Sequence, residues 1–394
     1  MAAKVKFLHR QKPVPAPAVR GSNRIGKQHR AFGDPVAFLK TSPKFEAVPF
    51  AAPVGDLVLS LDTVLPGVSA GVKKAKTLVF HTVGDTGGVN GTEAQDAVAK
   101  QMEQQVQNPG VDGSPAFFYH LGDVVYYNGI SLDYPAQFFE PYQYYPANIF
   151  AIPGNHDGDT HVRANDPTDP EPSLTGFRRT FCDSAPHPVS PYRNSMTQPY
   201  VYWTFDTPLA TFVGLYSNID GMLDAQDNGP QEAWLTGQLK NAATGKALIV
   251  AVHHSPYSLD VTHGGYPKIL ESLDNAIAGA KRVPDLVLSG HVHNYQRFSR
   301  KIGNRELPYI VAGAGGYANN AKLMHKMQTN GGSQIQLPFQ TTHKDLTLVK
   351  FNQTDPGFLK VTVTASQLVA EYNVVPFDVP ADGNPFDSVT VPLS

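Results

Sequence analysis

The sequence has very little cysteine: Cys182 is the only one in 394 residues. A single cysteine cannot form an intrachain disulfide, and it also excludes a metal site built on several thiolates. No apolar run reaches the ~18 residues that a membrane-spanning helix needs. Residues 1–24 are basic but lack the apolar core of a secretory signal peptide. The sequence as written therefore predicts a cytoplasmic protein, with export as the alternative if a leader has been removed.

The sequence also lacks an excess of charge of either sign. It has 32 Lys and Arg against 34 Asp and Glu, for a net charge of −2 at pH 7. Proteins that bind nucleic acid or anionic membranes through their charge usually carry a marked basic excess. We therefore expect neither a nucleic-acid surface nor a membrane partner. The hydrophobic content of 41% instead indicates a globular protein with a sizeable core.

Two parts of the chain differ in character. Residues 1–75 combine Pro-rich and polar stretches with short apolar runs, and we interpret them as an N-terminal extension or small cap. In residues 76–394, apolar runs alternate with helical patterns such as 93–106, which predicts an α/β fold with buried central strands. Two pairs of segments are typical of neighbouring strands in a second, more antiparallel sheet: 200–206 with 211–217, and 346–352 with 358–367.

Five apolar runs share one property: each ends in side chains that bind metal ions. A lone Asp after a strand is most often a turn or helix cap, and a lone His is most often structural. Five such strand ends in one chain favour a shared metal site over five separate structural roles, because the carboxyl ends of strands in an open α/β sheet meet at one crevice. The terminal residues are Asp85, Asp123, Asn155 with His156, His253 with His254, and His291 with His293.

The ligand types narrow the choice of metal. Oxygen and imidazole ligands suit Fe, Zn and Mn. Two carboxylates, one amide and three imidazoles are too many for one tetrahedral ion. They suit a pair of ions ~3.5–4 Å apart that share a bridging carboxylate. The pattern therefore predicts a dinuclear metal centre.

The order and spacing of these blocks resemble a known family. The blocks are "GDTG" (84–87), "GDVVY" (122–126), "GNHD" (154–157), "VAVHH" (250–254) and "GHVH" (290–293). They are similar to the five blocks of the calcineurin-like metallophosphoesterase superfamily, and more narrowly to its purple acid phosphatase-like branch. The general family has a histidine where Gly87 stands, whereas the purple acid phosphatases have glycine there and a tyrosine in the second block. Gly87 and Tyr126 therefore form a paired departure from the general pattern.

This resemblance implies a fold and a reaction. The fold would be a four-layer sandwich of two mixed β-sheets flanked by helices, with residues 76–394 as the catalytic domain. The reaction would be hydrolysis of a small phosphorylated substrate, a phosphate monoester, by attack of a metal-activated hydroxide. The metal ions would be Fe(III) together with Fe(II), Zn or Mn.

The resemblance also implies a ligand set, carried over block by block. The ferric site would use Asp85, Asp123, Tyr126 and His293, and the second site would use Asp123, Asn155, His253 and His291. Asp123 bridges the two ions in this scheme. A phenol with a pKa near 10 loses its proton at neutral pH only beside a strong Lewis acid, and a ferric ion is one. Two alternatives stay open: Tyr126 as a packing residue, and His254 in place of His253.

Two further histidines are candidate catalytic residues by the same resemblance. His156 follows the ligand Asn155 and is placed to reach the substrate phosphate or to donate a proton to the leaving group. His263 lies ten positions after His253, where the plant enzymes have a substrate-contacting histidine. The alternatives are a structural role for His156 and simple exposure on a loop for His263.

The ligand set does not by itself choose the substrate. The same site can act on phosphodiesters or nucleotides, because the chemistry at phosphorus is nearly the same. A non-catalytic metal-binding protein on this scaffold is a third hypothesis, which the intact ligand set argues against. The polar segment 157–175 is long enough to act as a lid or specificity element.

Overall fold

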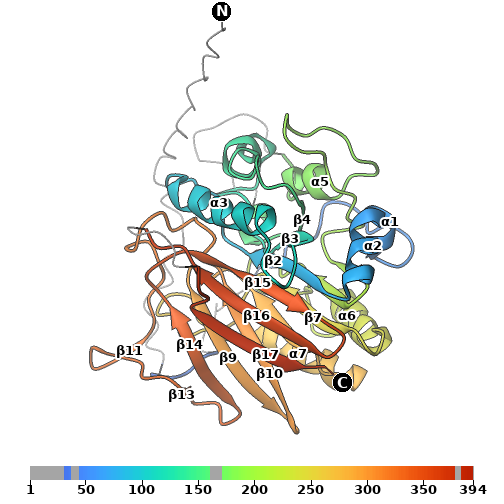
Figure 1. The fold of residues 1–394 in the computed structure, drawn as a ribbon. Coiled ribbons are helices and arrows are strands. Elements are labelled where there is room, and N and C mark those ends of the chain that lie inside the picture. Colours follow the sequence, from blue (N-terminus) through green and yellow to red (C-terminus); the bar gives the residue numbers. More distant parts are fainter. Residues whose placement is uncertain (1–30, 37–43, 160–170, 378–382, 394) are drawn as a thin grey trace, which may run out of the picture.

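The computed structural model describes residues 31–36, 44–159, 171–377 and 383–393. Two β-sheets face each other across the core, and helices cover their outer faces (Figure 1). The first sheet has six strands in the order β17-β16-β15-β2-β3-β4. Their bounds are β2 Leu78–Val83, β3 Phe117–His120, β4 Asn148–Ala151, β15 Gly357–Val363, β16 Gln367–Val374 and β17 Asp387–Pro392.

The second sheet has nine strands in the order β1-β5-β6-β7-β8-β10-β9-β14-β13. Their bounds are β1 Val58–Ser60, β5 Trp203–Asp206, β6 Ala210–Leu215, β7 Ala247–Val252, β8 Leu286–Ser289, β9 Tyr295–Ile302, β10 Arg305–Ala312, β13 Phe339–Gln340 and β14 Leu346–Asn352. A separate two-stranded ribbon pairs β11 (Thr329–Asn330) with β12 (Ser333–Gln334). Both large sheets mix parallel and antiparallel pairs, as expected.

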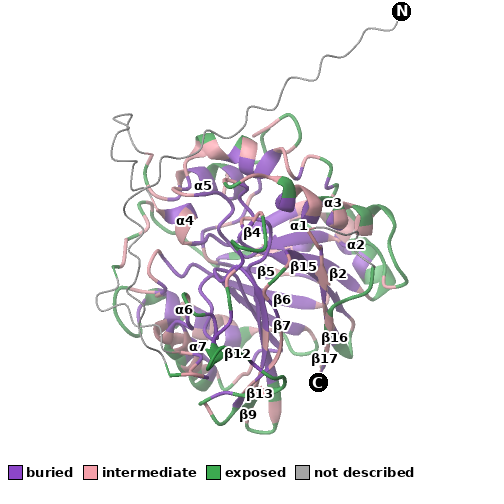
Figure 2. Ribbon diagram, turned by 90° about the vertical axis from the view of Figure 1, so that its left-hand side faces the viewer, coloured by how far each residue is buried: buried purple, intermediate pink, exposed green. Residues whose placement is uncertain are grey.

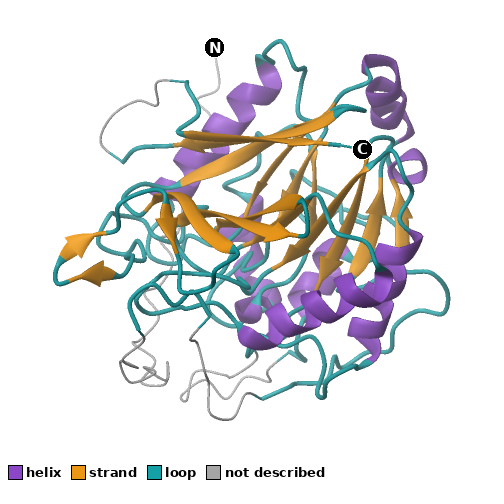
Figure 3. Ribbon diagram, turned by 90° about the horizontal axis from the view of Figure 1, so that it is seen from below, coloured by secondary structure: helices purple, strands orange, loops and turns teal. Residues whose placement is uncertain are grey.

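The helices form the two outer layers, which Figure 3 shows above and below the sheets. Helix α3 (Glu93–Gln107) connects β2 to β3 on the six-stranded side, and α6 (Pro230–Asn241) and α7 (Pro267–Ala280) cover the nine-stranded sheet. The predicted four-layer sandwich is therefore confirmed. The shorter helical segments are α1 Leu61–Val64, α2 Pro66–Ala75, η1 Ser131–Asp133, η2 Pro135–Phe139, α4 Asn155–Gly158 and α5 Thr175–Phe181.

Aromatic side chains fill the space between the two sheets. Phe80 of β2 and Phe117 of β3 meet Phe212 of β6 in edge-on contacts, with ring centroids 4.9 and 5.8 Å apart. Such contacts add to the stabilisation from burying large apolar surfaces. The burial of these strands explains why they read as continuous apolar runs and not as alternating ones (Figure 2).

One of the two expected strand pairs is confirmed and the other is wrong. Strands β5 and β6 pair antiparallel, with Trp203 opposite Gly214. Strand β14, however, pairs with β9 and β13, whereas β15 pairs with β16 and β2 of the other sheet. Residues 353–356 therefore carry the chain from one sheet to the other. Alternation along a strand reports which face is buried, and it does not say which strand lies alongside.

The N-terminal part of the described chain touches the main fold. Strand β1 pairs parallel with β5 at the edge of the nine-stranded sheet, and Leu61 and Val72 join the main core. Residues 1–30 and 37–43 lie outside the described residues, so the division at residue 75 stays a prediction. Among the helices in the described ranges, none combines the length and the apolar character needed to cross a membrane.

Candidate metal centre

The site lies where the carboxyl ends of strands from both sheets meet. Asp85, Asp123 and Asn155 follow β2, β3 and β4, which run parallel to one another. His253 and His291 follow β7 and β8, another parallel pair. Three of these five residues hold a left-handed backbone, with φ values of 59° at Asp85, 53° at Asp123 and 68° at His291. Residues other than glycine rarely adopt this conformation, and it clusters at functional sites where the surroundings enforce it.

Three donor atoms form a closed triangle on one side of the site. The hydroxyl oxygen of Tyr126 lies 3.2 Å from Asp85 Oδ1 and 3.3 Å from His293 Nε2. His293 Nε2 and Asp85 Oδ1 are 3.4 Å apart, which completes the triangle. All three side chains are almost fully buried. The predicted ferric ligands Asp85, Tyr126 and His293 therefore face one another.

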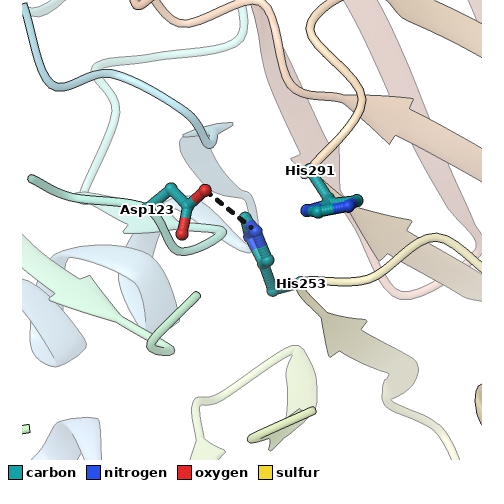
Figure 4. Close-up of side chains that lie close together, drawn as sticks. All are labelled: Asp123, His253 and His291. Carbon is teal, nitrogen blue, oxygen red and sulfur yellow. Dashed lines mark ion pairs between the residues drawn. The ribbon is translucent and has the colours of Figure 1, made fainter. Parts of the chain in front are cut away.

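A second group of donor atoms lies beside the first. Asn155 Oδ1 is 3.2 Å from His253 Nε2 and 2.9 Å from His291 Nδ1. Asp123 Oδ2 is 3.3 Å from His253 Nε2 (Figure 4). Burial raises the pKa of Tyr126 in the first group, and the negative charge of Asp123 also raises it. Asp123 thus lies between the two groups, where a bridging ligand would have to be.

The spacing of these atoms fits metal ions. Metal–ligand bonds of ~2.1 Å place neighbouring donor atoms on one ion ~3.0–3.4 Å apart. The observed separations within both groups run from 2.9 to 3.4 Å. The donors are carboxylate, phenol, amide and imidazole, which suit iron, zinc and manganese. The residues therefore fit a dinuclear centre, while the role of each one as a ligand stays a prediction.

Two of the histidines are held by their second ring nitrogen. His253 Nδ1 donates to the carbonyl oxygen of Leu121 at 2.8 Å, which leaves Nε2 without a proton in the neutral ring. His291 Nε2 lies 2.7 Å from the hydroxyl oxygen of Tyr266 while Nδ1 faces Asn155. Partners of this kind fix the tautomer and the orientation of metal-binding imidazoles. The sequence analysis missed Tyr266, which no motif singles out.

The neighbouring His254 lies differently. Its Nδ1 is 2.7 Å from Ser217 Oγ, which also accepts a hydrogen bond from the backbone N–H of His254. Its ring packs against those of Tyr266 and His291. Consecutive residues of a strand point to opposite faces, so His253 and His254 cannot both face Asp123 from an extended strand end. This arrangement favours His253 as the ligand and His254 as its neighbour.

The site brings several buried ionisable groups close together, which shifts their pKa values. Burial raises the pKa of the Asp85 carboxyl to about 8, and the nearby charge of Asp123 adds to the effect. Burial also opposes the charged forms of Asp123 and His253, but their mutual attraction outweighs it. The pKa of Asp123 is therefore lowered, and that of His253 is raised to about 9. Burial, together with Asp123 and Asp85, holds the pKa of Tyr126 well above its usual value. Cations would remove these costs.

The pairing of Gly87 with Tyr126 has a steric basis. A Cβ atom on residue 87 would lie 2.9 Å from Cδ2 of Tyr126 and 2.6 Å from Oε1 of Gln137. The Tyr126 ring therefore occupies the space into which a side chain at position 87 would extend. Gln137 in turn holds the backbone of Tyr126, accepting from its N–H at 2.8 Å and donating to its carbonyl at 2.7 Å. A histidine at position 87 and a tyrosine at position 126 thus exclude each other here.

The two candidate catalytic histidines lie beside different donor residues: His156 is near Tyr126, and His263 is near His291. His156 donates from Nδ1 to the carbonyl oxygen of Tyr127 at 2.8 Å, and its backbone N–H donates to Asp123 Oδ1 at 2.9 Å. The side chain of His263 is 29% exposed. Its ring centroid lies 5.1 Å from that of His291. Both are near the site, and their catalytic roles stay predictions.

Asp157 is a buried residue that the sequence analysis did not assign. Its carboxylate accepts hydrogen bonds from the backbone N–H groups of Val124, Val125 and Gly154, so it ties the second block to the third. Gly154 is needed at this junction, because a Cβ there would lie 2.1 Å from Asp123 Oδ1.

Of the segment 157–175, residues 160–170 lie outside the described residues, so its role as a lid stays a prediction.

A calcineurin-like phosphoesterase family model matches residues 78–295, more than half of the chain. This chain belongs to the calcineurin-like phosphoesterase family. It is accordingly a metal-dependent phosphoric ester hydrolase, and the family implies a dinuclear metal centre. The matched region contains all of the residues with which the two donor groups were built.

The chain is similar in sequence to purple acid phosphatases. It is 27% identical to tartrate-resistant acid phosphatase type 5 of Mus musculus over 286 residues, which cover 68% of this chain and 81% of the mouse protein. It is 28% identical to purple acid phosphatase 22 of Arabidopsis thaliana over 146 residues. That match covers 35% of this chain and only 32% of the plant protein. The similarity places the chain near the purple acid phosphatase-like branch.

Solved structures share the fold. Purple acid phosphatase PPD1 from yellow lupin seeds superposes with a TM-score of 0.57 at 19% identity, over 80% of this chain and 54% of the lupin chain. GAP50, the anchor in the inner membrane complex of Plasmodium, superposes with a TM-score of 0.53 at 15% identity. That match covers 81% of this chain and 89% of GAP50. At these identities the likeness concerns the fold alone.

Proposed function

We propose that this protein hydrolyses phosphate monoesters at a dinuclear metal centre of the purple acid phosphatase type. The observation that carries the proposal is the triangle of Asp85 Oδ1, the Tyr126 hydroxyl oxygen and His293 Nε2, with edges of 3.2 to 3.4 Å. A phenol at this place is unusual for the wider family and favours iron. The mouse relative, whose match covers 68% of this chain, carries the name of an acid phosphatase, which agrees with a monoester substrate.

Each ion would have its own ligands. Fe(III) would be held by Asp85, Asp123, Tyr126 and His293. Fe(II), Zn or Mn would be held by Asp123, Asn155, His253 and His291. When bound, the two cations neutralise phosphate charge and lower the pKa of water in the site toward neutrality. Asp123 lies between the donor groups and is the ligand that both sites share.

The protein's own groups contribute to the rest of the reaction. Hydrolysis breaks the bond between phosphorus and the leaving-group oxygen and forms a bond between phosphorus and a water oxygen. The leaving oxygen takes up a proton. Since Nδ1 of His156 is engaged with the Tyr127 carbonyl, Nε2 is the atom of this ring that can donate a proton. His263, on the side of His291 and His293, would contact the phosphate oxygens.

The experiment compares two substrates on metal-loaded protein. Turnover of a nitrophenyl phosphate monoester and of the bis-nitrophenyl diester is measured from acid to neutral pH, with metal content determined on the same samples. We expect a strong preference for the monoester. A preference for the diester would move the assignment to a phosphodiesterase acting on nucleotides or similar substrates. Turnover of neither substrate, with two ions bound per chain, would favour a non-catalytic metal-binding protein.

A further inference from the structure

A second cluster of ionisable side chains adjoins the metal centre. It consists of Asp260, His263 and His325, whose potential ligand atoms all lie within 4.8 Å of one another. Two chain segments bring the cluster together through an isolated bridge between Asp260 and Met327, reinforced by a hydrogen bond from Val261 N–H to the Lys326 carbonyl oxygen at 2.9 Å. His263 stands on one segment and His325 on the other, so their relative position depends on this pairing.

His325 is bound tightly to the loop of the predicted metal ligand His293. The backbone N–H of His293 donates to His325 Nδ1 at 3.0 Å, and the backbone N–H of His325 donates to the His293 carbonyl oxygen at 3.1 Å. The side chain of Asn294 also donates to the His325 carbonyl oxygen at 3.1 Å. Three hydrogen bonds thus fix both the backbone and the ring of His325 relative to the metal-binding loop.

The ring of His325 packs against two other imidazoles, those of His263 and His293, whose own centroids lie 6.5 Å apart. It stacks on His263 with centroids 4.3 Å apart and planes only 9° from parallel. It also stacks on His293, with a separation of 4.2 Å and an angle of 21°. Asp260 holds the other end of His263, because its carboxylate accepts the backbone N–H of that residue. His263 is therefore held between Asp260 and His325, beside the metal ligands.

A third metal ion is the first function that such a cluster suggests. Its geometry argues against one. The lone pair of an imidazole nitrogen lies in the plane of the ring, so two nearly parallel stacked rings cannot both direct lone pairs at one ion. In addition, Nδ1 of His325 already accepts a hydrogen bond from the backbone N–H of His293 and is not free to bind a metal ion. The stacked ring of His325 is instead placed to restrict the movement of the His263 ring.

We propose that His325 is a positioning residue, which fixes the ring of His263 relative to the metal ligand His293 and so sets where His263 meets the phosphate. This inference rests on the proposed function, in which His263 contacts the substrate. Holding a contact group in a defined place lowers the entropic cost of binding and reaction. Without the stack, His263 keeps its chemistry but samples other rotamers on its partly exposed loop.

Two substitutions separate the contacts of His325. His325→Asn keeps an acceptor for the His293 N–H but removes the stacked ring. His325→Phe keeps a flat ring for stacking but removes the acceptor. The matched controls are His187→Asn and His187→Phe, since the His187 side chain is 52% exposed and its partners are Asp183 and Ser195. All variants are loaded with metal, and their metal content is measured before any assay.

Two readouts are taken: kcat/KM for nitrophenyl phosphate, and the affinity for inorganic phosphate from calorimetry. We expect His325→Asn to keep two ions per chain and to lose about tenfold in both readouts. His325→Phe should keep much of the kcat/KM and of the phosphate affinity that His325→Asn loses, because it keeps the stacked ring. In a His263→Ala background, His325→Asn should have almost no further effect, because coupled residues give non-additive losses.

Other results would overturn the inference. Equal losses from His325→Asn with and without His263 would show that the two residues act independently. A third ion in the parent protein that is lost in His325→Asn would make His325 a metal ligand. The phosphate affinity separates this inference from the proposed function: a parent protein that turns over no phosphate ester would contradict the function, while the non-additive loss of phosphate affinity would still test the positioning.

Discussion

The two sheets supply different chemistry to one site. Loops after strands of the six-stranded sheet provide oxygen donors, from Asp85, Asp123, Tyr126 and Asn155. Loops after strands of the nine-stranded sheet provide only nitrogen donors, from His253, His291 and His293. Each proposed ion takes ligands from both sheets. The comparison shows that neither sheet alone carries all the predicted ligands of either ion, so a bound metal ion would link the two sheets.

The largest expected effect comes from the oxygen side. Asp123→Ala should lose both metal ions, because this carboxylate lies between the two donor groups, and phosphatase activity should fall by ~10³-fold or more. Metal analysis and turnover of nitrophenyl phosphate check the prediction. Asp227→Ala is the control, since Asp227 pairs with Lys268 at an exposed position. Two ions per chain in Asp123→Ala would contradict the shared-ligand arrangement.

Tyr126→Phe tests the oxygen donor that distinguishes this site within its family. We expect loss of any visible absorption band and weaker retention of iron, with activity reduced ~10²-fold. Absorption spectra and iron content are the measurements. Tyr127→Phe is a matched control, because the neighbouring hydroxyl faces Tyr317 and not the donor triangle. An unchanged spectrum in Tyr126→Phe would rule out a tyrosinate ligand.

Tyr266→Phe tests the nitrogen side. Its hydroxyl group contacts His291 Nε2, and loss of such a partner typically weakens metal affinity 10–100-fold. We expect the second ion to be lost at lower chelator concentrations than in the parent protein, while the iron is retained. Competition with a chelator, followed by metal analysis, measures this difference. Simultaneous loss of both ions would show that the two sites are not separable in this way.

The smallest effect concerns pH. Burial raises the pKa of Asp85 to about 8 and that of Asp157 to about 7, both from 3.8. Between pH ~4 and 8 the folded metal-free protein thus binds more protons at these groups than the unfolded chain, so their contribution to stability falls as pH rises. Metal ions need Asp85 without its proton, so the gain in Tm on adding Zn or Mn should be larger at pH 8 than at pH 5. Melting curves with and without metal test this; an equal gain at both pH values would contradict it.

The features that depend on neighbouring residues, namely the strands, their polar ends and helix α3, could be predicted from the sequence. The apolar runs before Asp85, Asp123 and His253 are strands, and their polar ends converge as the rule for parallel strands requires. The helix expected at 93–106 is α3, with Ala94, Val98 and Met102 buried.

The wrong strand pairing and the missed site residues depend on contacts between segments that lie far apart in the sequence. Strands β14 and β15 are near neighbours along the chain but belong to different sheets, and their alternation carries no information about that. Tyr266 and His325 lie in no block, and only the fold brings them to His291 and His293. Of the residues in this cluster, Asp260 is the one that the local sequence could have indicated, because it stands three positions before His263 in an Asp-x-x-His spacing.

The order of strands in the six-stranded sheet has a consequence for folding. Strand β2, which leads to Asp85, lies between β3 and β15. During synthesis β3 follows soon, but β15 is made only after β5 to β14 have been completed. Strand β2 therefore keeps one unpaired edge until most of the nine-stranded sheet has been synthesised. Such long-range pairing slows folding and exposes a strand edge to aggregation. Low-temperature expression should accordingly raise the yield of folded protein.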